Sequence, residues 1–138
     1  MFRIDYDPRA NVLDIHVSGF WKPEDVADFA RAIGAKAHEA RAIRDDFDVM
    51  VESLDFPVQA NDVADLLTNV MRGGTTLTSG NVAVVVGSQL NRLQAERTLA
   101  HPRLKVFLSI DDARHWLDET GQPAGMTQQP AWAMRPAP

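Results

Sequence analysis

The chain has 138 residues, 45% of them hydrophobic and 24% charged, which suits one globular domain with a single core. Its 14 basic and 19 acidic residues give a net charge of −5, so we expect no nucleic-acid partner and no binding to an anionic membrane surface. There is no cysteine, which excludes disulfides and Cys-based metal sites and fits a cytoplasmic protein. No apolar run approaches the roughly 18 to 20 residues of a membrane span, so no transmembrane segment is predicted.

Two segments with alternating apolar and polar residues open the chain, at positions 2–7 and 13–18, and predict half-buried strands. The "DPRAN" between them places proline and asparagine at turn positions, which predicts an antiparallel hairpin. A helix should follow, because Pro23 suits a first helical position. Its apolar face is predicted to comprise Val26, Phe29, Ala30, Ile33 and Ala37.

The middle of the chain predicts two further strands with a helix between them. Phe47, Val49 and Val51 mark the third strand, and Asn61 is the expected N-cap of the next helix. The apolar stripe of that helix is Val63, Leu66, Leu67, Val70 and Met71. Positions 82–87, "VAVVVG", form a continuous apolar run that predicts a strand buried on both faces.

Ser88 is expected to cap a more polar helix over about positions 89–100, and positions 104–109 predict a fifth strand. "SIDD" at 109–112 is a capping-box pattern that opens a short helix, expected to dock through Ile110, Ala113, Trp116 and Leu117. The order ββαβαβαβα predicts an α/β fold: a single domain with a mixed, mostly parallel five-stranded sheet and right-handed crossovers. We assign this domain to residues 1–119 and an irregular, proline-rich tail to residues 120–138.

Three stretches carry a family resemblance: "SGFWKPEDV", "VAVVVGSQLNR" and "VFLSIDDARHWL". From residue 2 to about 119 the chain resembles the SpoIIAA-like group of the STAS (anti-sigma-factor antagonist) superfamily, which shares features with CRAL-TRIO lipid-binding domains. The resemblance implies a non-catalytic binding or interaction module that takes a protein partner or an apolar, lipid-like small molecule. In the antagonists, phosphorylation of a serine at the start of the helix after the third strand controls binding to a kinase. The matching positions here are Ala60 and Asn61, and Ser53 lies too early, so we expect no phosphorylated serine.

Two groups of residues are candidate ligand contacts. Phe20 and Trp21 precede the first helix, and Leu54 and Phe56 follow the third strand, so both pairs should lie at one end of the sheet. They either line an apolar pocket or join the core. Ser88, Gln89 and Arg92 start the third helix, where free backbone N–H groups could bind an anionic headgroup or a carboxylate. The alternative for this second group is an ordinary capped surface helix.

Other chemistries have weaker support in the sequence. The four histidines show no metal-ligand spacing, and Asp14 with His16 lacks a third ligand, so no metal and no cofactor is predicted. The alternative to a binding module is a small hydrolase or transferase with its site near Ser88, although no catalytic residue can be assigned because no base partner is evident. Late in the tail, Trp132 and Met134 could anchor the segment on their own domain or on a neighbouring subunit. We favour the neighbouring subunit, which would make the protein a homodimer.

Overall fold

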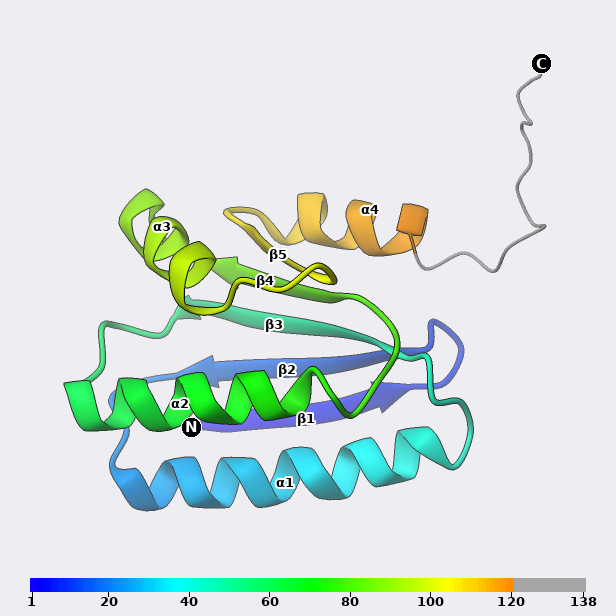
Figure 1. The fold of residues 1–138 in the computed structure, drawn as a ribbon, viewed down its shortest axis with the longest axis horizontal. Helices are drawn as coiled ribbons and strands as arrows, with labels where there is room; N and C mark the ends of the chain where they lie inside the picture. Colours follow the sequence, from blue (N-terminus) through cyan, green and yellow to red (C-terminus); the bar gives the residue numbers. More distant parts are fainter. Residues whose placement is uncertain (121–138) are drawn as a thin grey trace.

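The structure, a computed structural model, describes residues 1–120 and contains five strands and four helices in the predicted order (Figure 1). The strands are β1 (Phe2–Asp7), β2 (Val12–Ser18), β3 (Asp48–Asp55), β4 (Val82–Val86) and β5 (Leu104–Phe107). The helices are α1 (Pro23–Arg41), α2 (Asn61–Gly74), α3 (Gln89–Thr98) and α4 (Ile110–Thr120).

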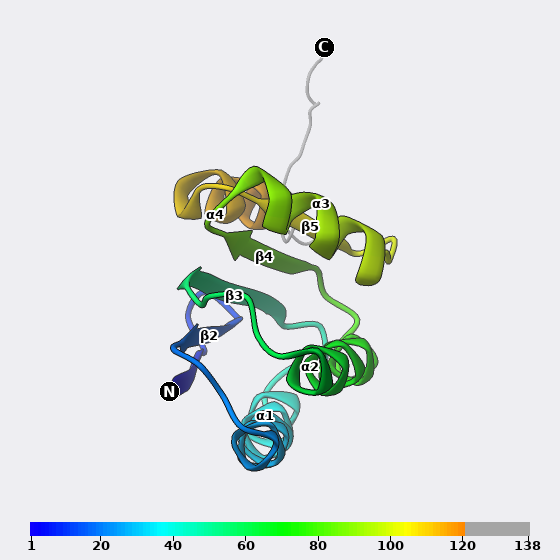
Figure 2. The same cartoon turned by 90° about the vertical axis from the view of Figure 1, so that its left-hand side faces the viewer.

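The five strands form one sheet whose spatial order, β1-β2-β3-β4-β5, repeats their order in the sequence. β1 and β2 pair antiparallel, and the other three pairs are parallel, which confirms the mixed, mostly parallel sheet. Each parallel crossover moves one strand in the same direction, so right-handed connections place α1, α2 and α3 on one face. The chain then turns back, and α4 covers the opposite face (Figure 2).

The core has two parts, one on each face of the sheet. The larger part fills the space under α1 and α2, where Val26, Phe29 and Ile33 of α1 and Val63 of α2 meet the inward residues of the strands. The smaller part lies under α4 and contains Met50, Ala83, Val85, Ala113 and Leu117. All five residues of β4 are buried, which confirms the prediction of a strand covered on both faces.

Several expected details are wrong. Asn61 does not cap α2: it is the first residue of the helix, and Ala60 occupies the N-cap position without a side-chain hydrogen bond. Ala30 and Leu66 are exposed, because the buried stripes of α1 and α2 are narrower than the apolar patterns. By contrast, α4 docks through the expected residues: Ala113 and Leu117 are buried, and Ile110 and the half-buried Trp116 pack against the same cluster.

The last described helix crosses the boundary that we predicted between domain and tail. α4 continues to Thr120, one residue past the predicted end of the domain. The expected tail anchors, Trp132 and Met134, fall outside the residues that the structure describes.

Candidate functional site

The carboxyl ends of the four parallel strands meet at one edge of the sheet, which faces the viewer in Figure 2. The connections leading from β2 to α1, β3 to α2, β4 to α3 and β5 to α4 all lie at this edge. In open α/β sheets this edge is where ligands usually bind, because the loops there vary without disturbing the strands. The residues that we expected as ligand contacts all lie here.

One member of each predicted apolar pair belongs to the core. Trp21 is 6% exposed, and its ring lies 5.2 Å from that of Phe56 and 5.0 Å from that of Phe29, centroid to centroid. Its indole Nε1 donates a hydrogen bond of 2.9 Å to the carbonyl oxygen of Ser18. The two pairs therefore do lie at the same end of the sheet, as expected, and Trp21 with Phe56 joins their loops through a buried aromatic contact.

Gln59 is a buried polar residue at this edge that sequence reasoning missed. Its Oε1 accepts a hydrogen bond of 2.8 Å from the backbone N–H of Trp21, and its Nε2 donates to the carbonyl oxygens of Gly19 at 2.9 Å and Pro57 at 2.8 Å. The side chain thus ties the β2–α1 loop to the β3–α2 loop. No local pattern could have revealed this role, because two of the three partners lie 38 and 40 residues away.

Large apolar side chains remain exposed after every parallel strand. Phe20, after β2, is 78% exposed, and Val58, after β3, is 71% exposed. The others are Leu54 at the end of β3, Leu90 after β4 and Leu108 after β5. We refer to these five residues as the carboxyl-edge surface. The sequence indicated Phe20 and Leu54 but not the other three, because a single leucine or valine next to the end of a strand is equally consistent with a buried core position.

Ser88, Gln89 and Arg92 lie at the start of α3, as predicted. The Ser88 hydroxyl accepts a hydrogen bond of 3.1 Å from the backbone N–H of Asn91, which is an ordinary N-cap contact. Gln89 is exposed. The Nε of Arg92 lies 3.5 Å from a carboxylate oxygen of Glu96 on the next turn, so its charge is already partly compensated within the helix.

A groove of about 460 Å³ runs between α2 and α3 beside this edge. Apolar residues such as Phe56 and Leu67 and polar residues such as Asp65, Gln94 and Arg97 line it. Its volume falls within the range of small-molecule sites, roughly 300 to 1,000 Å³, although it is open to solvent. The apolar cavity inside the core, between α1, α2 and the sheet, measures only about 20 Å³ and could hold a single water molecule at most.

Ser53, the hydroxyl residue nearest the position of the antagonists' phosphorylated serine, is part of the sheet. Its Oγ donates a hydrogen bond of 2.6 Å to the carbonyl oxygen of Val85 on the neighbouring strand, and the side chain is half-buried. A phosphate on this oxygen would break that bond and bring charge between two strands.

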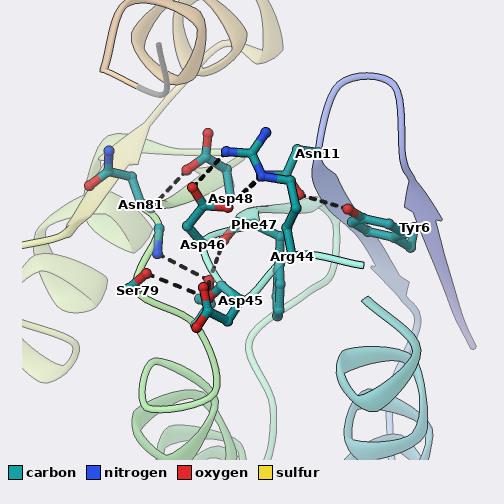
Figure 3. Close-up of polar contacts among 11 residues, drawn as sticks. Tyr6, Asn11, Arg44, Asp45, Asp46, Phe47, Asp48, Ser79 and Asn81 are labelled. Carbon is teal, nitrogen blue, oxygen red and sulfur yellow. Dashed lines mark hydrogen bonds and ion pairs between the residues drawn. The ribbon is translucent and has the colours of Figure 1, made fainter. Parts of the chain in front are cut away.

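The opposite, amino edge of the sheet contains a polar network (Figure 3). Arg44 forms a two-point ion pair with Asp46, with Nε to Oδ1 at 2.8 Å and Nη2 to Oδ2 at 2.6 Å, and this contact lowers the pKa of Asp46. Asn11, in the left-handed conformation with φ of 57°, donates to Asp46 at 3.1 Å and accepts from the Tyr6 hydroxyl at 2.6 Å. The network holds the hairpin turn against the α1–β3 connection, and we interpret it as structural.

Asp48 is the most buried carboxylate of this edge. Its Oδ1 accepts a hydrogen bond of 2.8 Å from the backbone N–H of Asn81, and burial nevertheless raises its pKa. The contact joins the start of β3 to the start of β4. The contact therefore helps to fix the register of β3 and β4, although burying the Asp48 carboxylate is unfavourable.

The face of β1 to β3 that α4 leaves uncovered is hollowed and polar, with a volume of about 240 Å³. His16 Nε2 lies 2.9 Å from Glu52 Oε1, and Asp14 lies 4.0 Å from Arg114. Burial raises the pKa of Asp14. No third residue completes a metal-binding group around Asp14 and His16 or elsewhere in residues 1–120.

Comparison with known proteins places the fold. The chain has a SpoIIAA-like fold: it superposes on an uncharacterized protein of the DUF3478 family with that fold from Shewanella loihica PV-4, with a TM-score of 0.64 and 14% identity over 84% of this chain and 93% of that one. It also superposes on an anti-sigma factor antagonist from Mycobacterium paratuberculosis, with a TM-score of 0.57 and 13% identity over 86% and 95% of the two chains. No family model and no curated protein matches the sequence. None of the described helices is both long and apolar enough to span a bilayer.

Proposed function

We propose that this chain is a non-catalytic interaction module that binds a protein partner through the carboxyl-edge surface. The observation that carries the proposal is the exposed apolar residue after each of the four parallel strands. Exposed apolar side chains that gather on one side of a protein mark interaction sites, because burying them in a complex removes apolar area from water. Loops at this edge present them without any change in the sheet.

The loops that carry Phe20 and Val58 are held in place before any partner binds, and Leu54 belongs to β3 itself. Gln59 joins the two loops through hydrogen bonds, and the packing of Trp21 on Phe56 joins them a second time. A surface that is already ordered loses little conformational entropy on association, so more of the contact energy contributes to affinity.

The fold supports a protein partner over a small molecule. One of the similar structures described above is an anti-sigma factor antagonist, whose name describes action against another protein. An apolar small molecule is the second candidate, supported by the groove between α2 and α3. Apolar residues such as Phe56 and Leu67 line that groove together with polar residues such as Asp65, and it is open to solvent. The cavity in the core is too small for a lipid chain.

We further propose that a serine phosphate at the start of α2 does not control this binding. Ala60 and Asn61 stand at the helix start and have no hydroxyl group, and the Ser53 hydroxyl is engaged with Val85. An enzyme centred on Ser88 draws less support, since the hydroxyl contacts the Asn91 backbone N–H as a cap.

Site-specific photo-crosslinking tests the proposal. A photoreactive amino acid placed at Val58 or Leu90 of the full chain should capture one defined protein in an extract of the source organism. The same probe at Ile43, a 59% exposed apolar residue near the amino edge, is the matched control.

With the captured partner purified, Val58→Glu and Leu90→Glu should each weaken its binding by about 2 kcal/mol, roughly 30-fold, whereas Ile43→Glu should leave it unchanged. Capture from Ile43 with equal yield, or affinity that is insensitive to both substitutions, would refute the assignment of the surface. Binding of an apolar dye that is lost in Val58→Glu, without any protein crosslink, would instead favour the small-molecule alternative.

A further inference from the structure

β1 is an edge strand, and its outer side offers unpaired backbone groups. Met1 and Ser18 are directly opposite each other, and each donates a backbone hydrogen bond of 2.9 Å to the other. In an antiparallel pair this arrangement recurs at every second residue, so Arg3, Asp5 and Asp7 also direct their backbone N–H and C=O groups toward β2. The intervening residues, Phe2, Ile4 and Tyr6, therefore direct their N–H and C=O groups away from β2. Within residues 1–120, no hydrogen bond involves these outward groups.

The sequence of β1, "FRIDYD", is complementary to itself when it runs antiparallel. A two-fold axis through the pairing at Ile4 sets Arg3 opposite Asp5 of a second copy, and Phe2 opposite Tyr6. We propose that β1 pairs with β1 of a second copy of this chain in this register, so that the two sheets become one. The interface is isologous, and each favourable pair therefore occurs twice.

The hydrogen-bond pattern and the charges select the same register. Ile4 would pair with Ile4, and Phe2 with Tyr6, through the backbone groups that point outward. Arg3 and Asp5 would then occupy the pairs without hydrogen bonds, where side chains are closest. Within one chain the Nε of Arg3 lies 3.6 Å from Oδ2 of Asp5, and the two side chains are 72% and 69% exposed. Because this pair is exposed and weak, both side chains can exchange it for the facing charge of a second copy.

The two adjacent registers are disfavoured. Centring the axis on Arg3 places that residue against its own copy, and centring it on Asp5 brings two carboxylates together. Like charges directly opposite each other destabilise a strand pair. The register centred on Asp5 would also set Arg3 opposite Asp7, but it keeps the contact between the two Asp5 carboxylates and sets Phe2 opposite Pro8, which has no N–H group. The register centred on Ile4 joins opposite charges without a like-charge pair and uses the outward groups of all three apolar residues. The charges on this edge therefore specify one pairing as well as discouraging others.

This association is independent of the proposed function. β1 forms the edge strand of the sheet, whereas the carboxyl-edge surface lies at the ends of β2 to β5. In the dimer the two carboxyl-edge surfaces would face opposite directions, because the paired strands run antiparallel. Both surfaces would stay open to a partner.

Charge reversal on full-length protein tests the proposal by sedimentation velocity over a wide range of concentration. The unmodified chain should self-associate, and Arg3→Asp and Asp5→Arg should each lower the association constant at least about tenfold, because each change creates two like-charge pairs. An equimolar mixture of the two variants should form a heterodimer, since Asp at position 3 then faces Arg at position 5. The double variant should dimerise like the original chain.

Lys105→Asp is the matched control, because Lys105 is an exposed residue of β5, the strand at the other edge of the sheet. Its dimer should form normally, and the circular dichroism spectra of all variants should be the same. A chain that stays monomeric at every concentration overturns the proposal. So does a dimer that both single variants retain, which would indicate the tail or another surface, and so does a mixture of the two variants that stays monomeric.

Discussion

Replacing Gln59 by alanine should destabilise the fold by about 2 to 5 kcal/mol, although the residue lies in a loop. The backbone N–H of Trp21 would lose its acceptor in a buried position, which costs about 1 to 3 kcal/mol. The carbonyls of Gly19 and Pro57 are partly buried, so the loss of each bond adds roughly 0.5 to 1 kcal/mol. A typical alanine substitution on an exposed surface changes stability by less than about 0.5 kcal/mol.

Urea unfolding followed by tryptophan fluorescence measures this change. The midpoint should fall by roughly 1 to 3 M without a change in the dependence on denaturant, and amide hydrogen exchange should show faster exchange of the Trp21 N–H. Gln94→Ala, at an exposed position of α3, is the control and should leave the midpoint unchanged. An unchanged midpoint for Gln59→Ala, with the Trp21 amide still protected, would show that the two loops are held by aromatic packing alone.

Three further predictions concern charge, packing and modification. Burial raises the pKa of Asp48, so the folded protein binds this proton more tightly than the unfolded chain, and the associated stability is present below pH about 4 and lost as pH rises through the folded pKa. Asp48→Asn keeps an acceptor for the Asn81 N–H and should be at least as stable as the original protein at pH 7. Urea unfolding at acidic and at neutral pH should show that the variant loses less stability than the original as the pH rises. A large destabilisation of the variant at pH 7 would contradict this. Leu117→Ala should cost about 2 to 5 kcal/mol and half-buried Trp116→Ala about 1 to 3 kcal/mol in urea unfolding, and the reverse order would mean that the tryptophan contributes more than Leu117 to the docking of α4. Intact mass of protein from its source cell should show no phosphate, and a stoichiometric phosphate on Ser53 would contradict our interpretation of the β3–α2 loop.

The fold could be predicted from the sequence because most of its elements carry strong local patterns. The alternation in β1 and β2, the apolar run of Val82–Val86 and the order of strands and helices are enough to define the sheet. The Ser88 cap was also predicted correctly, because a serine before a polar helical segment is a local signal. The predictions were wrong for details, such as the N-cap of α2, that depend on tertiary contacts. Ala60 lies at the start of α2 without a side-chain cap, and Asn61 is already helical.

The candidate site was predicted only in part, for the same reason. The sequence placed Phe20 and Trp21 beside Leu54 and Phe56, but it could not tell which aromatic ring fills the core and which faces water. Exposure is decided by neighbours that are distant in the chain, such as the Phe29 ring against Trp21. Gln59 is the clearest case, because glutamine is usually a surface residue and nothing in its local sequence indicates burial.

The agreement between spatial and sequential strand order bears on how the chain folds during synthesis. Every strand after the first pairs with the strand made just before it, so each new strand can be added to an edge that already exists. Contacts between strands that are close in the sequence have a low closure entropy and favour rapid folding. Among the described elements, α4 is the last to be synthesised, and until it docks, Met50, Ala83 and Val85 remain exposed to water. A nascent chain that stalls before residue 110 would therefore present an apolar sheet face, the surface that chaperones recognise and that aggregates form from.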